Sequence, residues 1–209
     1  MKKSLFTLLF VLISLFTFAQ SFEGKIIYQL TYKSKMPSVT DAQFSSMMGN
    51  TQNYYIKGGD YKSETNGSFI LSQLYINKDN KLYNKFSNSG ALLWNDGAVN
   101  PDSVISSALN KGVIVNLGHK CDELVLTCKS GLQKYYFTSK LPADSKLYVN
   151  HRFGNWYAFL SKANAIPLKM TIDNANFYME AIATDIKPMK LDAALFTLPA
   201  GVETKKSPY

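Results

Sequence analysis

Residues 22–33, FEGKIIYQLTYK, decide the fold class because their polarity alternates with a period of two. Successive side chains of a β-strand point to opposite faces of its sheet. One face of this stretch is apolar and carries Phe22, Ile26, Tyr28, Leu30 and Tyr32. The other face carries Glu23, Lys25, Gln29, Thr31 and Lys33, and its only large apolar residue is Ile27. The pattern therefore predicts a strand with one buried face and one solvated face.

Short alternating or apolar runs continue along the chain. They lie at 52–57, 61–65, 69–77, 81–86, 92–94, 113–116, 120–129, 132–138, 156–160, 167–172 and 176–185. Turn sequences such as KGGD, TNGS, SNSG and DNAN separate several of them. Many short strands with such connections predict an antiparallel sandwich or barrel. No repeat or linker divides the chain, so we expect residues 20–209 to form a single β domain, with a last strand at 195–198 and a frayed tail at 202–209.

Two segments depart from this pattern and predict short amphipathic helices. In residues 38–49, SVTDAQFSSMMG, apolar side chains recur at helical spacing between a capping Ser38 or Thr40 and a terminating Gly49. In residues 100–112, NPDSVISSALNKG, Asn100 can cap a helix and Pro101 suits its first position. The apolar stripe of this second helix would be Val104, Ile105, Ala108 and Leu109. Each helix has one apolar face, so we expect each to pack against a sheet.

The N-terminal sequence MKKSLFTLLFVLISLFTFAQ has the pattern of a secretory signal peptide. Lys2 and Lys3 precede an apolar run at 5–18, which ends at the small residue Ala19. We therefore predict a signal peptide at 1–19, cleaved between Ala19 and Gln20. The alternative is an uncleaved anchor, but the run is short for a membrane span and no basic stop-transfer flank follows it. We expect a periplasmic protein, associated with the outer membrane or secreted, with no transmembrane segment after cleavage.

The chain carries a formal net charge of +8, which falls to +6 when Lys2 and Lys3 leave with the signal peptide. The lysines form no block, so solvated strand faces explain them better than a dedicated anionic partner does. A nucleic-acid partner is a poor fit, because the sequence shows no DNA- or RNA-binding motif.

Cys121 and Cys128, in the stretch GHKCDELVLTC, are the only two cysteines. A zinc site would need four ligands, and a redox pair would favour Cys-x-x-Cys at the start of a helix. A continuous strand over 120–129 would put the two sulfurs on opposite faces, with Cα atoms about 23 Å apart. A disulfide needs Cα atoms within about 7 Å, so this possible pairing is disfavoured although export would favour oxidation. We expect both cysteines to be buried side chains with a structural role, and we predict no metal and no cofactor.

Catalytic motifs do not emerge from the sequence. It contains no Gly-x-Ser-x-Gly elbow, no phosphate-binding loop and no Gly-x-Gly-x-x-Gly. His119 and His151 have no evident catalytic partner, so we expect surface or partly satisfied histidines. We name no catalytic residue and predict that the protein is not an enzyme.

Aromatic residues are the remaining signal, since the chain contains 13 Tyr and 13 Phe. In a curved sheet, an inner set of rings could line an apolar cavity. The candidates are Trp94, Trp156, Tyr157 and Phe159, with Phe44, Met47 and Met48 of the first predicted helix as a lid. Plain core packing is the alternative for each of them.

Several stretches occur in an order that resembles a known family. They are FEGKIIYQLTY at 22–32, YYIKGGDYKSET at 54–65, LGHKCDELVLTC at 117–128, YYFTSKLPAD at 135–144, IPLKMTI at 166–172 and KLDAALFTLPAG at 190–201. The chain is similar to an exported domain-of-unknown-function family of Gram-negative bacteria, a cousin of the GLPGLI family. Both resemble in fold the periplasmic lipoprotein carriers LolA and LolB. The resemblance implies a mainly β fold, with a curved antiparallel sheet that forms a half-open barrel around the two short helices.

The resemblance also implies a function. In the carriers the concave face binds acyl chains, which predicts a non-enzymatic cell-envelope protein that holds a hydrophobic ligand or a lipidated or membrane protein there. The GLPGLI signature is absent, because the region after SKLPAD reads SKLYVNHRFGNWYAFLSKANAIP. The single arginine, Arg152, does not align with the cavity arginine of the carriers. The alternatives are an accessory subunit docking on an outer-membrane protein complex and, third, a hydrolase without a visible motif.

Overall fold

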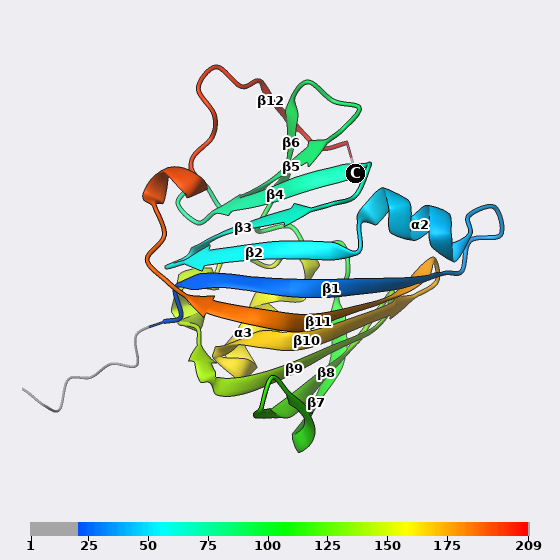
Figure 1. Ribbon diagram of the computed structural model, residues 1–209, viewed down its shortest axis with the longest axis vertical. Helices are drawn as coiled ribbons and strands as arrows, with labels where there is room; N and C mark the ends of the chain where they lie inside the picture. The colour runs from blue at the N-terminus through cyan, green and yellow to red at the C-terminus, as the bar shows by residue number, and fades with distance from the viewer. Residues whose placement is uncertain (1–20, 209) are drawn as a thin grey trace, which may run out of the picture.

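The computed structural model describes residues 21–208, which form one curved, open β-sheet and two short α-helices (Figure 1). The predicted signal peptide and its cleavage site at Ala19 and Gln20 lie outside the described residues. The first strands are β1 (Gly24–Ser34), β2 (Thr51–Lys57), β3 (Asp60–Thr65), β4 (Ile70–Ile76), β5 (Lys81–Phe86) and β6 (Leu92–Asp96). The remaining strands are β7 (Val104–Asn116), β8 (His119–Cys128), β9 (Gly131–Pro142), β10 (Ala165–Asn174), β11 (Phe177–Pro188) and β12 (Thr204–Lys206).

The described strands are ordered β12-β6-β5-β4-β3-β2-β1-β11-β10-β9-β8-β7. β1 is therefore central, and two antiparallel meanders run outward from it. The pair β12–β6 is parallel. The predicted class, a mainly β protein built on a curved antiparallel sheet, is confirmed.

A short connection shows how strongly the sheet curves. β6 and β7 lie near opposite ends of the strand order, yet only residues 97–103 join them. Such a segment spans at most about 28 Å when fully extended. The register also shifts at Ile27/Tyr28 in β1 and around Pro167 in β10. Bulges of this kind bend strands, so they contribute to the half-open shape.

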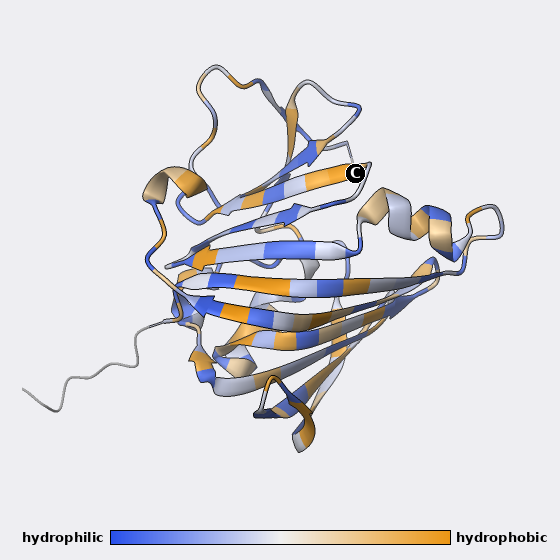
Figure 2. Ribbon diagram, viewed as in Figure 1, coloured by the Kyte–Doolittle hydropathy of each residue, from blue (hydrophilic) through white to orange (hydrophobic). Residues whose placement is uncertain are grey.

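The strand predicted from the opening stretch is confirmed as β1. Ile26, Tyr28, Leu30 and Tyr32 are buried, and they alternate with more exposed residues. Figure 2 shows strands of mixed hydrophilic and hydrophobic colour throughout the sheet. The inner face of β1 belongs to the main core, which extends to β2, β8, β9, β10 and β11.

Helix α2 (Asp41–Met48) confirms the first predicted helix. Thr40 caps it, because its hydroxyl accepts a hydrogen bond from the Gln43 amide, and the Gln43 side chain accepts one from the Thr40 amide. This reciprocal arrangement is a capping box. Gly49 ends the helix with φ of 88°, a conformation that favours glycine.

The predicted helix at 100–112 is wrong, because this region contributes the edge strand β7 (Val104–Asn116). β7 pairs with β8 along most of its length, with register shifts between Val104 and Ser106 and between Asn110 and Ile114. The ladder of β8 offers backbone partners to this segment, and such tertiary pairing overrides local propensity. The apolar stripe that suggested a helix is left on an exposed strand.

The predicted strand at 156–160 is also wrong, because these residues begin helix α3 (Trp156–Ala163). Phe159 and Leu160 are completely buried. Five consecutive apolar residues do not distinguish a strand from a buried helix. Helix α3 ends at Asn164, which adopts the left-handed conformation with φ of 45°.

The C-terminal segment also differs from the prediction. Residues expected to form a last strand instead form a 3₁₀ helix, η3 (Ala193–Phe196), and part of the expected frayed tail pairs with β6 as β12. Phe196 and Leu191 are buried with Leu74 and Tyr83 in a second, smaller core. Tyr83 is paired with Trp94 across β5 and β6, so both lie on the face of the sheet opposite the main core.

Candidate functional site

Helix α3 lies on the concave side of the sheet, where it contacts β8, β9 and β10 (Figure 1). The Phe159 ring stacks on Tyr135 at 4.3 Å between centroids and meets Phe137 edge-on at 5.9 Å. Before α3, the amides of Arg152 and Phe153 both donate to the Gly97 carbonyl, at 2.7 and 3.0 Å. This inserted segment therefore fastens the β6–β7 connection to the helix that fills the concave side.

A cavity of about 140 Å³ remains between the N-terminal end of α3 and the inner faces of β1–β4 and β10. A cavity of about 150 Å³ holds one benzene molecule, and a water molecule takes about 30 Å³. We call it the central cavity. Its lining combines rings with small polar side chains: Tyr28, Gln52, Tyr54, Tyr61, Ser63, Gln73, Trp156, Pro167 and Met170.

Three polar atoms in the walls of the central cavity are buried and have no hydrogen-bond partner within residues 21–208. They are Gln52 Oε1, the Tyr54 hydroxyl and Trp156 Nε1. The nitrogen of the Gln52 side-chain amide orients this group, because Nε2 donates a hydrogen bond to Ser63 Oγ at 2.7 Å. A buried polar group without a partner costs about 1–3 kcal/mol. A partner from outside the chain, a ligand or water, would recover that free energy after small side-chain rotations.

The walls of the central cavity are uncharged. No Asp, Glu, Lys or Arg is among its lining residues. Burial raises the pKa of Tyr54 and Tyr61 well above the usual tyrosine value, so both hydroxyls keep their protons at neutral pH. Moving a charge into such surroundings without a counter-ion is strongly unfavourable. The site is therefore suited to an uncharged group.

His151 does not line the central cavity but contacts Tyr61, which does. Its Nε2 lies 2.8 Å from the Tyr61 hydroxyl, and its ring stacks on Tyr75 with 3.9 Å between centroids. The side chain is only 1% exposed, and its Nδ1 has no partner in the described chain. Burial lowers the pKa of His151 to about 3, so the ring is neutral at physiological pH. The expectation of a partly satisfied histidine fits this position, although His151 is a core residue.

The central cavity contains only one of the predicted aromatic candidates, Trp156. Phe159 and Tyr157 follow it on α3 but pack in or against the main core. Trp94 lies on the opposite face of the sheet, where it packs against the second core and Lys81 Nζ lies 4.1 Å from its ring centroid.

The proposed lid residues also lie elsewhere. Phe44 is buried against Tyr32 and Phe177 at one end of β1. Met48 is partly buried, and Met47 is 41% exposed. None of the three lines the central cavity, because α2 packs on β1 away from α3.

Gln52, Tyr54 and Tyr61 were not predicted as site residues. The run at 52–57 already had the strand period, and Tyr54 occupies its buried face together with Ile56. What was not visible in the sequence is the order β3-β2-β1, which brings Tyr61, Tyr54 and Tyr28 side by side.

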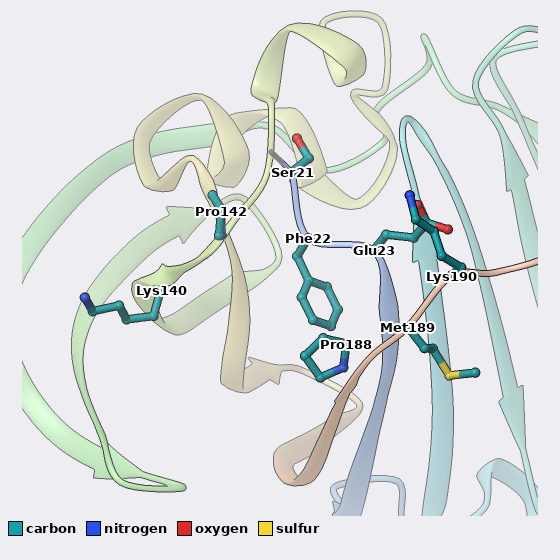
Figure 3. A pocket seen from close by; sticks show the side chains of 8 residues that line it. All are labelled: Ser21, Phe22, Glu23, Lys140, Pro142, Pro188, Met189 and Lys190. Atoms are coloured by element: carbon teal, nitrogen blue, oxygen red, sulfur yellow. The ribbon is translucent and has the colours of Figure 1, made fainter. Parts of the chain in front are cut away.

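A larger and more open hollow of about 470 Å³ lies where β1 begins (Figure 3). The Phe22 ring points toward Pro188 in this view. The polar groups here hold chain ends together: the Phe22 amide donates to the Pro142 carbonyl at 2.7 Å, and Glu23 accepts from the Leu191 amide at 2.7 Å. We interpret this hollow as a junction between strand ends.

Cys121 and Cys128 lie near opposite ends of β8, and both are buried free thiols. The predicted continuous strand is confirmed. Burial raises the pKa of both thiols, that of Cys128 to about 11. The Asn155 side-chain amide lies 3.3 Å from Cys128 Sγ, beneath the start of α3. Both thiols therefore pack as small buried side chains.

Residues 21–208 lack two other kinds of feature. No group of three His, Cys, Asp or Glu side chains there is arranged to hold a metal ion. None of the helices there has the length and apolar character needed to cross a bilayer.

The fold and the site define a class: a curved-sheet β protein with an inserted helix and a small uncharged cavity on the concave side. The chain is similar to part of PNGF-II, with a TM-score of 0.50 and 16% identity over 90% of this chain. The match covers 32% of PNGF-II, so this chain spans about a third of that protein. At this identity the likeness concerns the fold alone.

A second solved structure, a LolA superfamily protein from Nitrosomonas europaea, matches with a TM-score of 0.38 and 8% identity, over 86% of this chain and 91% of that one. A likeness at this level supports no argument about function. No family model matches the chain, and no curated protein matches it. Membership of the GLPGLI-related exported family therefore stays a prediction.

Proposed function

We propose that this protein is a non-enzymatic binding protein of the cell envelope that holds an uncharged, partly apolar group of its ligand in the central cavity. The observation that carries the proposal is the trio of buried, unpartnered polar atoms in the walls of one aromatic-lined cavity. Polar groups of this kind fix the orientation of a ligand in an otherwise apolar site.

The three atoms favour a particular ligand chemistry. Trp156 Nε1 can only donate, Gln52 Oε1 can only accept, and the Tyr54 hydroxyl can do both. A hydroxyl or a primary amide offers a donor and an acceptor together. The cavity volume suits a single six-membered ring or a group of similar size. We infer a neutral ring or branched apolar group that bears a hydroxyl or an amide.

A longer ligand, such as the acyl chain of a lipid or lipidated protein, would enter only with its end unless α3 moved away. The cavity is smaller than the usual 300–1,000 Å³ of small-molecule sites. Moving α3 would expose Phe159 and Leu160, whose burial contributes about 1.5–3 kcal/mol each. A hydrophobic carrier built on this fold would therefore need a ligand that compensates for the exposed helix face.

The test uses Trp156 fluorescence in a Trp94→Phe background, where Trp156 is the only tryptophan. The probes are benzyl alcohol and benzamide, with benzoate and benzylamine as charged analogues of similar size. We expect saturable spectral changes with the neutral pair only. Absence of saturable binding by either neutral probe, or equal binding of the charged analogues, would refute the proposal.

A matched pair of variants locates the site. Tyr54→Phe removes an unpartnered hydroxyl, so we expect unchanged or slightly raised stability and weaker binding of benzyl alcohol. Tyr55→Phe makes the same change on the opposite face of β2, where Tyr55 packs against the second core. It should leave binding unchanged. Equal affinities for the two variants would count against the central cavity.

A second candidate function, docking on a larger protein complex, is favoured by the edge strand β7. Ile105 and Val115 are 71% and 70% exposed, and Leu109 and Val113 are also exposed. β7 is the last strand in the described sheet, and its first seven residues, VISSALN, carry no charge. Edge strands are usually protected by charge or proline, and an unprotected one can pair with a strand of a partner.

The docking function would be tested by Ile105→Lys, with the exposed Leu147→Lys as a control away from β7. Co-purification of a defined partner with the wild type and the control, but not with Ile105→Lys, would support docking. Retention of the same partner by Ile105→Lys would exclude this edge. Self-association that is lost only in Ile105→Lys would show instead that β7 pairs with a second copy.

A further inference from the structure

A second cavity, of about 340 Å³, lies on the convex side of the sheet beneath the C-terminal segment. Its floor comes from β3–β6, and its roof from η3 and the residues that follow. The volume is within the usual range for small-molecule sites. We call it the convex cavity. It is separate from the central cavity, because neighbouring residues of a strand face opposite sides of the sheet.

The strand register explains the composition of the floor. Lys62 of β3 is opposite Leu74 of β4, which is opposite Tyr83 of β5, so these side chains form one row across the sheet. Ser72 is opposite Lys85 in the adjacent row. Side chains paired in this way lie on the same face. The convex cavity therefore has an apolar floor with a lysine on either side.

The roof is mostly apolar, with Thr197 as its one polar lining residue, and it is held at both ends by hydrogen bonds. Leu195, Pro199 and Val202 line the cavity from above. At one end, the Leu191 amide donates to Glu23 Oε1 at 2.7 Å, and at the other the Leu92 amide donates to the Glu203 carbonyl at 2.9 Å. The segment between these anchors covers the cavity.

The two lysines differ in their charge partners. Lys62 Nζ forms an ion pair with Glu64 at 2.8 Å. Lys85 Nζ donates to the Ser89 carbonyl at 2.8 Å, and no carboxylate within residues 21–208 lies within ion-pair distance of it. A cation beside an apolar cavity is thus left without a neutralising acid. An anionic group would form a charge-assisted hydrogen bond there.

We propose that the convex cavity binds a medium-chain fatty acid, with the carboxylate at Lys85 and the alkyl chain between the sheet and the C-terminal roof. The charge at the rim matches a carboxylate, and the floor and roof match an alkyl chain. The proposal does not rest on the function assigned to the central cavity, because the ligand class and the face of the sheet both differ. Burial of the chain supplies the driving force, and the ion pair fixes the direction of binding.

The experiment is calorimetric titration of the full chain with decanoate, and with decanol and decyltrimethylammonium as neutral and cationic analogues. We expect decanoate to bind with one-to-one stoichiometry, decanol more weakly, and the cation not at all. Lys85→Met keeps the length of the side chain and removes its charge. It should weaken decanoate binding by about tenfold or more.

Lys81→Met is the matched control, because Lys81 is in the same strand but lies over Trp94 and does not line the convex cavity. It should bind decanoate as the wild type does, and so should Tyr54→Phe. The unfolding midpoints of all variants would be measured to exclude misfolding. The proposal is overturned if decanoate does not bind, if Lys85→Met and Lys81→Met bind it equally, or if only Tyr54→Phe weakens binding.

Discussion

Lowering the pH from about 7.5 to about 5 is expected to destabilise the protein through His151. The folded protein holds this imidazole against the rings of Tyr75 and Tyr61, and burial lowers its pKa to about 3 from an ordinary value of 6.5. Below the ordinary value the unfolded chain binds a proton that the folded protein does not bind. The free energy of unfolding therefore decreases as the pH falls toward the folded pKa.

The size of the effect follows from the two pKa values. One pKa unit corresponds to about 1.4 kcal/mol, so protonation of His151 in the unfolded chain should cost about 2 kcal/mol between about pH 7.5 and about pH 5. The carboxylates with lowered pKa, such as Asp122 and Glu123, act in the same direction but have ordinary values of 3.8 and 4.5. Above about pH 5 the histidine should dominate.

Urea unfolding at a series of pH values would measure this dependence in the wild type, in His151→Gln and in His119→Gln. His119 opens β8 and is not fully buried, so its variant is the matched control. The expected result is a pH slope that disappears in His151→Gln and persists in His119→Gln. A wild-type stability that is flat between about pH 7.5 and about pH 5, or an equal slope in all three proteins, would contradict a buried His151 that stays neutral in the folded protein.

Three further predictions concern the fold. Phe159→Ala should lower the free energy of unfolding by about 3–5 kcal/mol, because it leaves a cavity where α3 meets the sheet. The control Ser161→Ala changes an exposed residue of the same helix and should alter the free energy of unfolding little. Urea denaturation would measure both variants. Cys121 and Cys128 should resist a thiol reagent in the native protein, and both should react after unfolding. The mass of the unmodified protein should be the same in the presence and absence of reductant. A mass lower by two hydrogens without reductant would contradict free thiols. Thr40→Ala should destabilise the protein by about 1 kcal/mol through the lost cap of α2, and an unchanged thermal midpoint would argue against the capping box.

The two incorrect helix and strand predictions have a common cause. Residues 100–112 have a capping residue, a proline at the first position and a helical stripe, yet β8 offers backbone partners along most of 104–116. Residues 156–160 are continuously apolar, which suits a buried strand or a buried helix equally. In both cases the deciding interaction is made with another element, which is the following strand β8 for 104–116 and the strands β8–β10 for α3.

The candidate site shows the same limit. Trp156 was identified because it is aromatic, but its neighbours in the central cavity come from five strands in two separate parts of the chain. Whether a tyrosine hydroxyl or a glutamine oxygen has a hydrogen-bond partner depends on atoms that no spacing pattern describes. The convex cavity was not predicted either, because its roof was expected to be a final strand and a frayed tail.

Four features could be predicted from the amino-acid sequence: the mainly β class, the buried face of β1, the first helix, and the continuity of the strand that contains both cysteines. These features depend on side-chain periodicity and on contacts between residues close in the chain. Three other features became visible only in the folded protein: residues 104–116 form an edge strand, α3 packs on the concave side, and each face of the sheet has a cavity. Those outcomes depend on strand order and on packing between distant segments, which local patterns do not encode.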